Sequence, residues 1–268
     1  MGCNKLNNYY IKDIDKIIDD NIKLKTKGYG YLTVTERLSG GYCCVKFEDT
    51  GWVTNAKFDN ILYGKVRDKM ARTAYGVGVI GSKYPTSMNG KKIREYSLWL
   101  SILSRVYSKS ERKSLSTYKG CEVSENFKSY EYFYEWCNNQ VGFNSLDEKG
   151  KYFEIDKDLL IKNNKVYSED GCVFIPHSLN TLLVKSNSIR GEHLIGVCYN
   201  KKLNKYQANI KKYSKPIYVG LFDTELDAFN AYKVEKEIYV KELAQKYQND
   251  IDERSYVALL NYKVDIND

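Results

Sequence analysis

The first third of the chain changes from helical to alternating apolar spacing. Between residues 8 and 24, apolar side chains recur at intervals that predict an amphipathic helix: Tyr10, Ile14, Ile17, Ile18 and Ile22. Two alternating runs follow, at 31–35 and 42–47, with a Ser-Gly-Gly turn between them. A third run covers 51–58. We therefore expect residues 1–75 to form a helix and a small antiparallel β-unit.

The middle of the chain begins with a glycine-rich, basic segment over residues 76–94, which we interpret as a linker. Its glycines do not have the GxGxxG spacing of a phosphate-binding loop. Two helices are predicted after it, at 95–108 and 128–139. Each carries one apolar face: Trp99, Ile102, Leu103 and Tyr107 on the first helix, and Tyr130, Phe133, Tyr134 and Cys137 on the second. We interpret this aromatic stripe as core.

The last third of the chain has the clearest pattern. Three short strands are predicted at 193–200, 205–212 and 216–222, and the middle one alternates strictly. Its apolar face consists of Tyr206, Ala208 and Ile210, and its polar face of Lys205, Gln207, Asn209 and Lys211. A helix follows, with Thr224 as its N-cap and Glu225 in its first turn. Its small and apolar positions, Ala228, Ala231, Tyr232 and 234–238, are expected to cover the apolar face of the sheet.

This segment resembles the APETALA or ethylene-response-factor type of DNA-binding domain. The framework "IGV...KYQANI.....YVGLFDTELDAFNAY" matches over about 50 residues, so we assign residues 190–248 to such a domain. The resemblance implies a three-stranded sheet that lies in the major groove of DNA. The implied DNA-binding residues are Asn200, Lys202, Lys205, Gln207, Asn209, Lys211 and Tyr218.

The chain departs from the plant members of that family at the positions that contact bases. Cys198 and Asn200 stand in the slots of arginines on the first strand, Lys211 replaces another arginine, and Tyr218 replaces a tryptophan. The fold and DNA binding therefore carry over as expectations, whereas the plant target sequence does not.

Residues 95–185 resemble phage-encoded HNH proteins, which commonly carry the same DNA-binding domain. The match consists of the helical lead-in "W..IL.RVYS......TYKGCEVSENF.SYEYFYEW" and the stretch "IDKD......YSEDGC.F.P..LN". It implies a ββα-metal fold in which Asp156 takes the strand ligand slot and Asn180 the helix ligand slot for one divalent cation, Mg²⁺ or Mn²⁺. Lys157 stands in the slot of the histidine base, and Gly171 in that of the asparagine that orients it.

Two residues leave the catalytic prediction open. Lysine, with an ordinary pKa of about 10.4, is a poor base unless it is buried, so Lys157 is either an altered base or a phosphate contact. His177 lies one helical turn before Asn180. It is either a substitute base or third ligand, or a surface histidine at the start of a helix.

Composition narrows the class of partner. The net charge is +8, and it is unevenly spread: residues 55–119 contain 14 Lys/Arg against 4 Asp/Glu, and residues 181–216 contain 8 against 1. Such basic blocks favour a polyanionic partner. The 7 cysteines form no CxxC pair, which argues against a disulfide framework and a zinc ribbon. No apolar run is long enough to span a membrane. We expect free thiols and a cytoplasmic location in a bacterial host cell.

The sequence thus predicts an α+β protein and three alternative functions. The first is a phage-type HNH endonuclease that binds double-stranded DNA, the second a non-catalytic DNA-binding regulator, and the third a phage protein that binds and inhibits a host defence protein. The acidic tail, residues 249–268, is expected either to pack as a short helix through Val257, Leu259 and Leu260 or to hold a partner.

Overall fold

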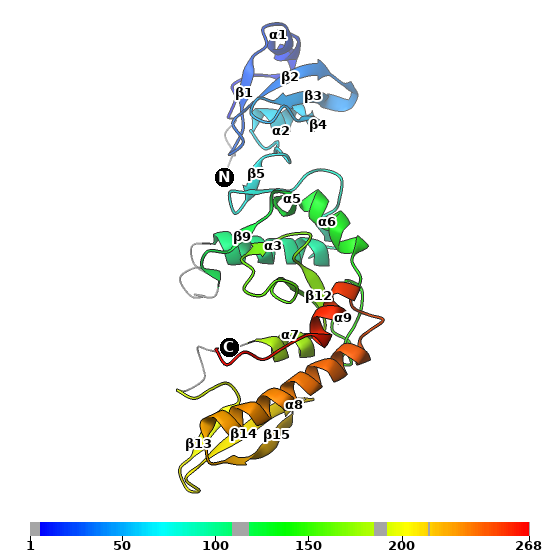
Figure 1. Ribbon diagram of the computed structural model, residues 1–268. Coiled ribbons are helices and arrows are strands. Elements are labelled where there is room, and N and C mark those ends of the chain that lie inside the picture. The colour runs from blue at the N-terminus through cyan, green and yellow to red at the C-terminus, as the bar shows by residue number, and fades with distance from the viewer. Residues whose placement is uncertain (1–5, 109–117, 185–191, 214, 268) are drawn as a thin grey trace. The chain divides into compact units, whose positions relative to one another are not determined.

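The computed structural model describes residues 6–108, 118–184, 192–213 and 215–267 (Figure 1). The chain divides into two compact units, of which unit 1 comprises Met1–Lys119 and Glu125–Tyr134, and unit 2 comprises Gly120–Ser124 and Glu135–Asp268. The fold is mixed α+β, as predicted. The predicted segment boundaries at residues 75, 94 and 185 do not coincide with this division, which passes through one of the predicted helices.

Unit 1 begins with a four-stranded antiparallel sheet in the order β1-β2-β3-β4. Its elements are η1 (Ile11–Asp13), α1 (Ile14–Asp19), β1 (Lys23–Lys25), β2 (Tyr31–Arg37), η2 (Ser39–Gly41), β3 (Tyr42–Phe47), β4 (Val53–Lys57) and α2 (Phe58–Leu62). The predicted hairpin and third strand are confirmed. Apolar side chains of both helices and all four strands form one buried cluster, in which Ile17, Val45 and Phe47 are fully buried.

The predicted helix over residues 8–24 is too long. The α-helix ends at Asp19, and Asn21 lies in the left-handed region with φ of 48°. Residues 23–25 then pair with β2, so that Leu24 is buried in the sheet rather than on a helix. The alternation of Lys23, Leu24 and Lys25 follows the two-residue period of a strand, and here pairing with β2 decides the structure.

The glycine-rich segment 76–94 forms two short hairpins in the structure. They pair β5 (Arg72–Ala74) with β6 (Gly78–Val79), and β7 (Ser87–Met88) with β8 (Lys91–Lys92). Gly78 packs directly on the helix that follows, because a Cβ there would lie 2.7 Å from the Trp99 ring and 2.6 Å from Leu103. The missing side chain is therefore what permits the contact.

Most of the predicted aromatic core is confirmed, but Tyr107 and Tyr134 are only half-buried. It lies between α3 (Arg94–Tyr107), α5 (Glu125–Lys128) and the start of α6 (Tyr130–Asn139). Trp99 is buried, and its indole Nε1–H donates to the Phe127 carbonyl oxygen at 2.8 Å. Phe127 and Phe133 meet edge to face, with ring centroids 5.0 Å apart. The polar edge of the buried indole is thus satisfied while its ring packs.

Unit 2 contains two small strand pairs and a helix before its main sheet. β9 (Glu122–Val123) pairs with β11 (Val166–Tyr167) in parallel, and β10 (Glu154–Asp156) pairs with β12 (Val173–Ile175) antiparallel. α7 (His177–Leu183) follows β12 and packs back on β10. This gives a two-stranded antiparallel unit followed by a helix.

The carboxy-terminal sheet has the predicted order β13-β14-β15, from β13 (Val197–Asn200), β14 (Lys205–Lys212) and β15 (Lys215–Phe222). It packs on α8 (Glu225–Lys246) (Figure 1). Thr224 is the N-cap, as predicted: its side chain accepts a hydrogen bond from the Asp227 N–H at 3.2 Å.

The predicted apolar face of α8 is partly wrong. Val234 and Ile238 are exposed, whereas the buried side chains are Ala228, Phe229, Tyr232, Lys236, Tyr239, Val240, Leu243 and Ala244. Residues spaced three and four apart share a helix face, and the buried set follows that rule. Val234 and Ile238 are four residues apart and share a face, but that face is exposed to solvent, and the three residues between them are charged.

The tail packs within unit 2 through α9 (Glu253–Leu260). Leu259 is buried as predicted, whereas Val257 is 49% exposed. The Glu237 carboxylate on α8 accepts from Lys263 Nζ at 2.9 Å and from the Val264 N–H at 3.1 Å. The six cysteines among the described residues are free, and none of the helices described is apolar and long enough to cross a bilayer. Cys3 lies outside the described residues.

We expect Gly196→Ala to destabilise unit 2 by about 2 kcal/mol or more. Gly196 has φ of 78°, and a Cβ there would lie 2.2 Å from the buried Tyr232 ring. Gly150→Ala is the matched control, because Gly150 has φ of 69° and a Cβ there would meet no described atom within 4 Å. It should cost only about 1 kcal/mol. Denaturant unfolding of both variants measures the difference, and equal costs would contradict this account of Gly196.

Candidate functional site

The predicted DNA-binding residues gather on the face of the β13-β14-β15 sheet opposite α8, which we call the outer face. Strand register places Asn200 beside Lys205, and Cys198 beside Gln207. On the other side of β14, Asn209 pairs with Tyr218, and Lys211 with Pro216. Lys202 lies in the turn between β13 and β14.

Side chains on the outer face hydrogen-bond to one another along and across strands. Gln207 Nε2 donates to Asn209 Oδ1 at 2.9 Å, and Asn209 Nδ2 lies 3.5 Å from Cys198 Sγ. These contacts orient two amide groups side by side. Lys205 pairs with Asp223 at 3.0 Å, and Tyr218 is 57% exposed.

The opposite face of the sheet is committed to α8. Ala208 and Ile210 are buried beneath the helix, and Lys212 Nζ reaches over to Glu235 of α8 at 2.8 Å. A bulge on β15 between the partners of Ala208 and Asn209 shifts the register there, yet Tyr218 remains opposite Asn209. The structure thus separates the stabilising side of the sheet from a polar, solvent-facing side.

A second polar cluster joins β10 to α7. Glu154 Oε1 lies 2.9 Å from His177 Nδ1, and Glu154 Oε2 accepts from Asn180 Nδ2 at 2.7 Å. Since a carboxylate only accepts, His177 Nδ1 carries a proton and a neutral imidazole presents its lone pair at Nε2. Thr181 Oγ1 lies 3.3 Å from that Nε2. The His177 side chain is 52% exposed, so the ring is held in place yet reachable from solvent.

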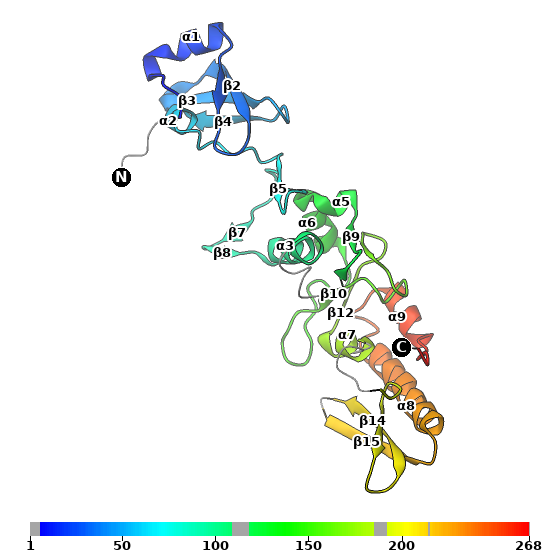
Figure 2. The same ribbon diagram turned by 90° about the vertical axis from the view of Figure 1, so that its left-hand side faces the viewer.

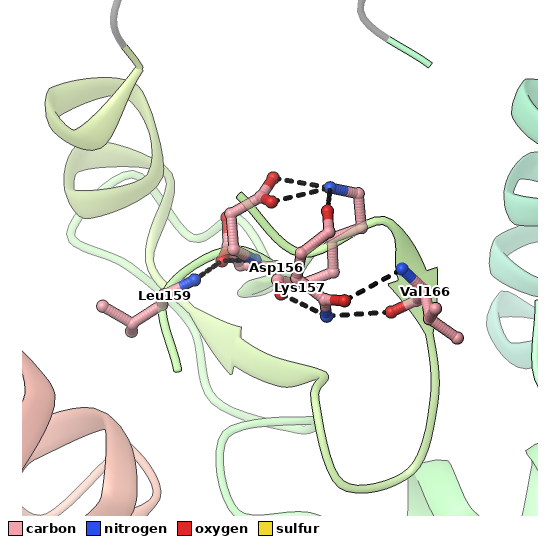
Figure 3. Close-up of polar contacts among 6 residues, drawn as sticks. Asp156, Lys157, Leu159 and Val166 are labelled. Atoms are coloured by element: carbon pink, nitrogen blue, oxygen red, sulfur yellow. Dashed lines mark hydrogen bonds and ion pairs between the residues drawn. The ribbon is translucent and has the colours of Figure 1, made fainter. Parts of the chain in front are cut away.

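The loop after β10 fixes two residues that the sequence placed at the catalytic centre, Asp156 and Lys157 (Figure 3). Asp156 Oδ1 accepts from the backbone N–H groups of Asp158 and Leu159, at 2.8 and 2.7 Å. Lys157 is buried, and its ammonium donates to both Asp158 oxygens at 2.7 and 2.8 Å and to the Asn164 carbonyl oxygen at 2.6 Å. The Lys157 amine therefore serves to close this loop.

Burial sets the electrostatics around Asp156. It raises the pKa of the Asp156 carboxyl, while the two backbone N–H donors act against that rise. The neighbouring Cys172 is buried, and burial together with the Asp156 charge raises the pKa of its thiol to about 12. Cys172 is therefore a thiol at neutral pH and is inert as a nucleophile.

The predicted cation ligands, Asp156 and Asn180, have different hydrogen-bond partners in the structure. Asn180 donates to Glu154 rather than facing Asp156 through a shared ion. Across the part of the chain that the structure describes, no three His, Cys, Asp or Glu side chains converge as metal ligands do.

Sequence reasoning missed two residues of this region. Asn164 spans the loop, because its Nδ2 donates to the carbonyl oxygens of Lys157 and Val166 at 2.8 and 2.9 Å. It also lies where a side chain at Gly171 would be, 2.8 Å from a Cβ there. Glu154 was missed although it stands two residues before Asp156, a spacing that puts both side chains on the same side of a strand.

A cavity of about 890 Å³ in unit 2 is lined by residues of both polar clusters. His177 and Thr181 of α7 contribute to it, as do Asn209 and Lys211 of β14, and α8 adds Tyr239. Of the residues predicted from the sequence, His177, Asn209 and Lys211 thus border one cavity.

No family model, no curated protein and no solved structure matches this chain.

Glu148 connects the loop before β10 to the end of α8. Its carboxylate accepts from Lys246 and, at 2.5 Å, from the Tyr247 hydroxyl. The hydrogen bond from Lys246 is the main reason that the pKa of Glu148 falls to about 2, and the Tyr247 hydroxyl is the next. Burial and the nearby carboxylate raise the pKa of Tyr247.

A carboxyl group whose pKa is lowered by folding stabilises the fold above its ordinary pKa, and that stabilisation is lost as the pH falls toward about 2. We therefore expect Glu148→Gln to lower the thermal midpoint at neutral pH, and the gap from wild type to narrow between about pH 5 and pH 3. Thermal melts across that range measure it. Glu242→Gln, at an exposed position on the same helix, is the control. A gap that does not change with pH would contradict the ion-pair account.

Proposed function

We propose that this protein binds double-stranded DNA through the outer face of the β13-β14-β15 sheet. The observation that carries the proposal is the strand register, which sets Asn200, Lys205, Gln207, Asn209 and Lys211 on one solvent-facing side. These side chains have the chemistry that DNA binding requires, because lysines neutralise phosphates and the amides of Asn and Gln pair with base edges, adenine above all.

The dimensions of the sheet support the same proposal. Neighbouring strands lie about 4.8 Å apart, so three strands span about 10 Å between the axes of the outer two. The major groove is about 12 Å wide, and β-structure is one of the elements that enter it. The basic block at 181–216, with 8 Lys/Arg against 1 Asp/Glu, includes this sheet and adds long-range attraction to DNA.

Charge reversal at Lys205 and Lys211 tests the proposal. We expect the Lys205→Glu, Lys211→Glu double variant to lose duplex binding at least tenfold and to lower the slope of log affinity against log salt by about 2, since each lost phosphate contact removes about 0.9. Fluorescence anisotropy with a labelled duplex over a range of salt concentrations measures both quantities.

The matched control reverses the charge of Lys16 and Lys25, two exposed lysines of unit 1. They lie outside the β13-β14-β15 sheet, and their reversal changes the net charge by the same amount. If both double variants bind like wild type, the sheet is not the DNA-binding surface. A host protein then becomes the better candidate partner, to be sought by capture after nuclease treatment.

Phosphodiester cleavage is the second candidate function, and the contact between Glu154 and His177 favours it. A carboxylate that accepts from Nδ1–H holds an imidazole so that Nε2 can take a proton from water, as in known base–orienter pairs. The arrangement of β10, β12 and α7 agrees with the ββα unit that the sequence resemblance implies. His177, rather than Lys157, would then act as the base.

Conversion of supercoiled plasmid tests this candidate. With Mg²⁺ or Mn²⁺ added, we expect nicking by wild type and loss of at least 100-fold in rate in His177→Ala, which is the range that general-base catalysis supplies. His193→Ala is the control, because His193 is the other histidine of the chain and lies beside Tyr206 and Glu225. Asp156→Ala tests the predicted ligand in the same assay. A wild type that binds DNA without nicking it would leave binding as the function.

A further inference from the structure

Unit 1 contains a polar groove that the proposed function does not use. It has a volume of about 520 Å³, and α3 forms one wall. Three serines of α3 line it, Ser97, Ser101 and Ser104, whose spacing of four and three residues puts them on one face of the helix. Its cationic lining residues are Lys92 and Arg105, and none of the described residues that line it is a carboxylate.

We propose that this groove, together with the β7–β8 hairpin beside it, binds the phosphate backbone of duplex DNA. It would be a second DNA contact, separate from the outer face of the sheet in unit 2. The proposal extends the proposed function, but it stands on residues of unit 1 alone.

The residues of the groove suit phosphodiester oxygens. The Arg105 guanidinium lies 5.7 Å from the centre of the Tyr118 ring, a cation–π contact that restricts the guanidinium. Arginine binds phosphate through two parallel N–H donors, and a guanidinium already held in place loses less entropy on binding. Hydroxyl and ammonium groups are the other common donors to DNA phosphates, and both line this groove.

The β7–β8 hairpin links the groove to a wider basic surface. Its turn residues, Asn89 and Gly90, have φ of 51° and 75°, as in the two-residue turns that match the twist of paired strands. Met88 is 64% exposed, and Lys91 and Lys92 are exposed beside it. Figure 2 shows the hairpin extending away from α3. Lys92 belongs to both features, so the hairpin and the groove form one continuous surface.

The distribution of charge favours an extended anion over a small one. The cations follow the hairpin and α3 instead of converging on one point, and this segment belongs to the basic block 55–119. Two acidic side chains of unit 1 are already engaged by other residues. Asp68 is buried and accepts from Thr50 Oγ1 at 2.6 Å, and Glu125 pairs with Lys128 at 2.5 Å. A polymer with regularly spaced phosphates matches such a surface.

The test uses the full chain and a duplex of about three helical turns without a chosen sequence. The variants are Lys92→Glu with Arg105→Glu, and Lys91→Glu with Lys92→Glu. The second variant alters only exposed hairpin side chains and so avoids loss of folding. We expect each to weaken binding at least tenfold and to lower the salt slope by about 1 to 2, whereas Lys16→Glu with Lys25→Glu leaves both unchanged. Circular dichroism confirms that each variant is folded.

The Lys205→Glu, Lys211→Glu variant, measured beside them, separates this proposal from the proposed function. Losses in both sets support two contacts. A loss only in the unit 1 variants supports the groove and overturns the sheet as the DNA-binding surface. A loss only in the sheet variant overturns the groove. Wild-type affinity in all of them overturns both. The groove proposal alone is overturned if the groove binds a phosphopeptide and DNA does not compete with that peptide.

Discussion

The packing of α8 is the interaction on which unit 2 depends. Three strands alone cannot bury a core, because one face of such a sheet always meets water unless another layer covers it. α8 supplies that layer through buried side chains that include Phe229, Tyr232 and Tyr239. Beyond its last turn the chain leaves the sheet and packs on a different part of the unit, where the ring of Tyr247 meets Phe153 edge to face at 5.7 Å. One helix thus stabilises both the sheet and the segment that precedes β10.

Because α8 covers only one face of the sheet, the outer face is available to bind a ligand. The buried apolar side chains of β14, Ala208 and Ile210, lie toward α8, so the residues on the other face contribute little to the core. Asn209 and Gln207 hydrogen-bond to each other and not to a buried partner. Side chains with such surroundings can change with little effect on folding, and a protein can therefore adapt them to a ligand.

The sheet and its helix cap were predictable because each rests on a local pattern. Alternation assigned the two faces of β14, and Thr224 marked the start of α8. Which side of α8 faces the sheet was harder to predict, because Val234 and Ile238 form an apolar pair at helical spacing on the side that is exposed to solvent. The hairpins of 76–94 were missed for another reason: Gly78 is required by its contact with Trp99, and such a contact appears only when the two segments are folded together.

The acidic region around β10 shows the same limit for side-chain chemistry. The family resemblance placed Asp156 and Lys157 at the catalytic centre, but in the structure both form hydrogen bonds within the loop after β10. Asn164, seven residues beyond Lys157, also bonds within that loop. Glu154, by contrast, holds two residues of α7 through its two oxygens.

Strand geometry supplies the reason. Glu154 and Asp156 lie on the same side of β10, but only Glu154 pairs with Ile175, two residues before His177, whereas Asp156 pairs with Val173. The carboxylate nearer to the helix therefore meets the helix, and the other turns into the loop. For the proposed cleavage, the histidine that Glu154 orients is therefore a better candidate base than Lys157, because the Lys157 ammonium is already shared between Asp158 and a backbone carbonyl.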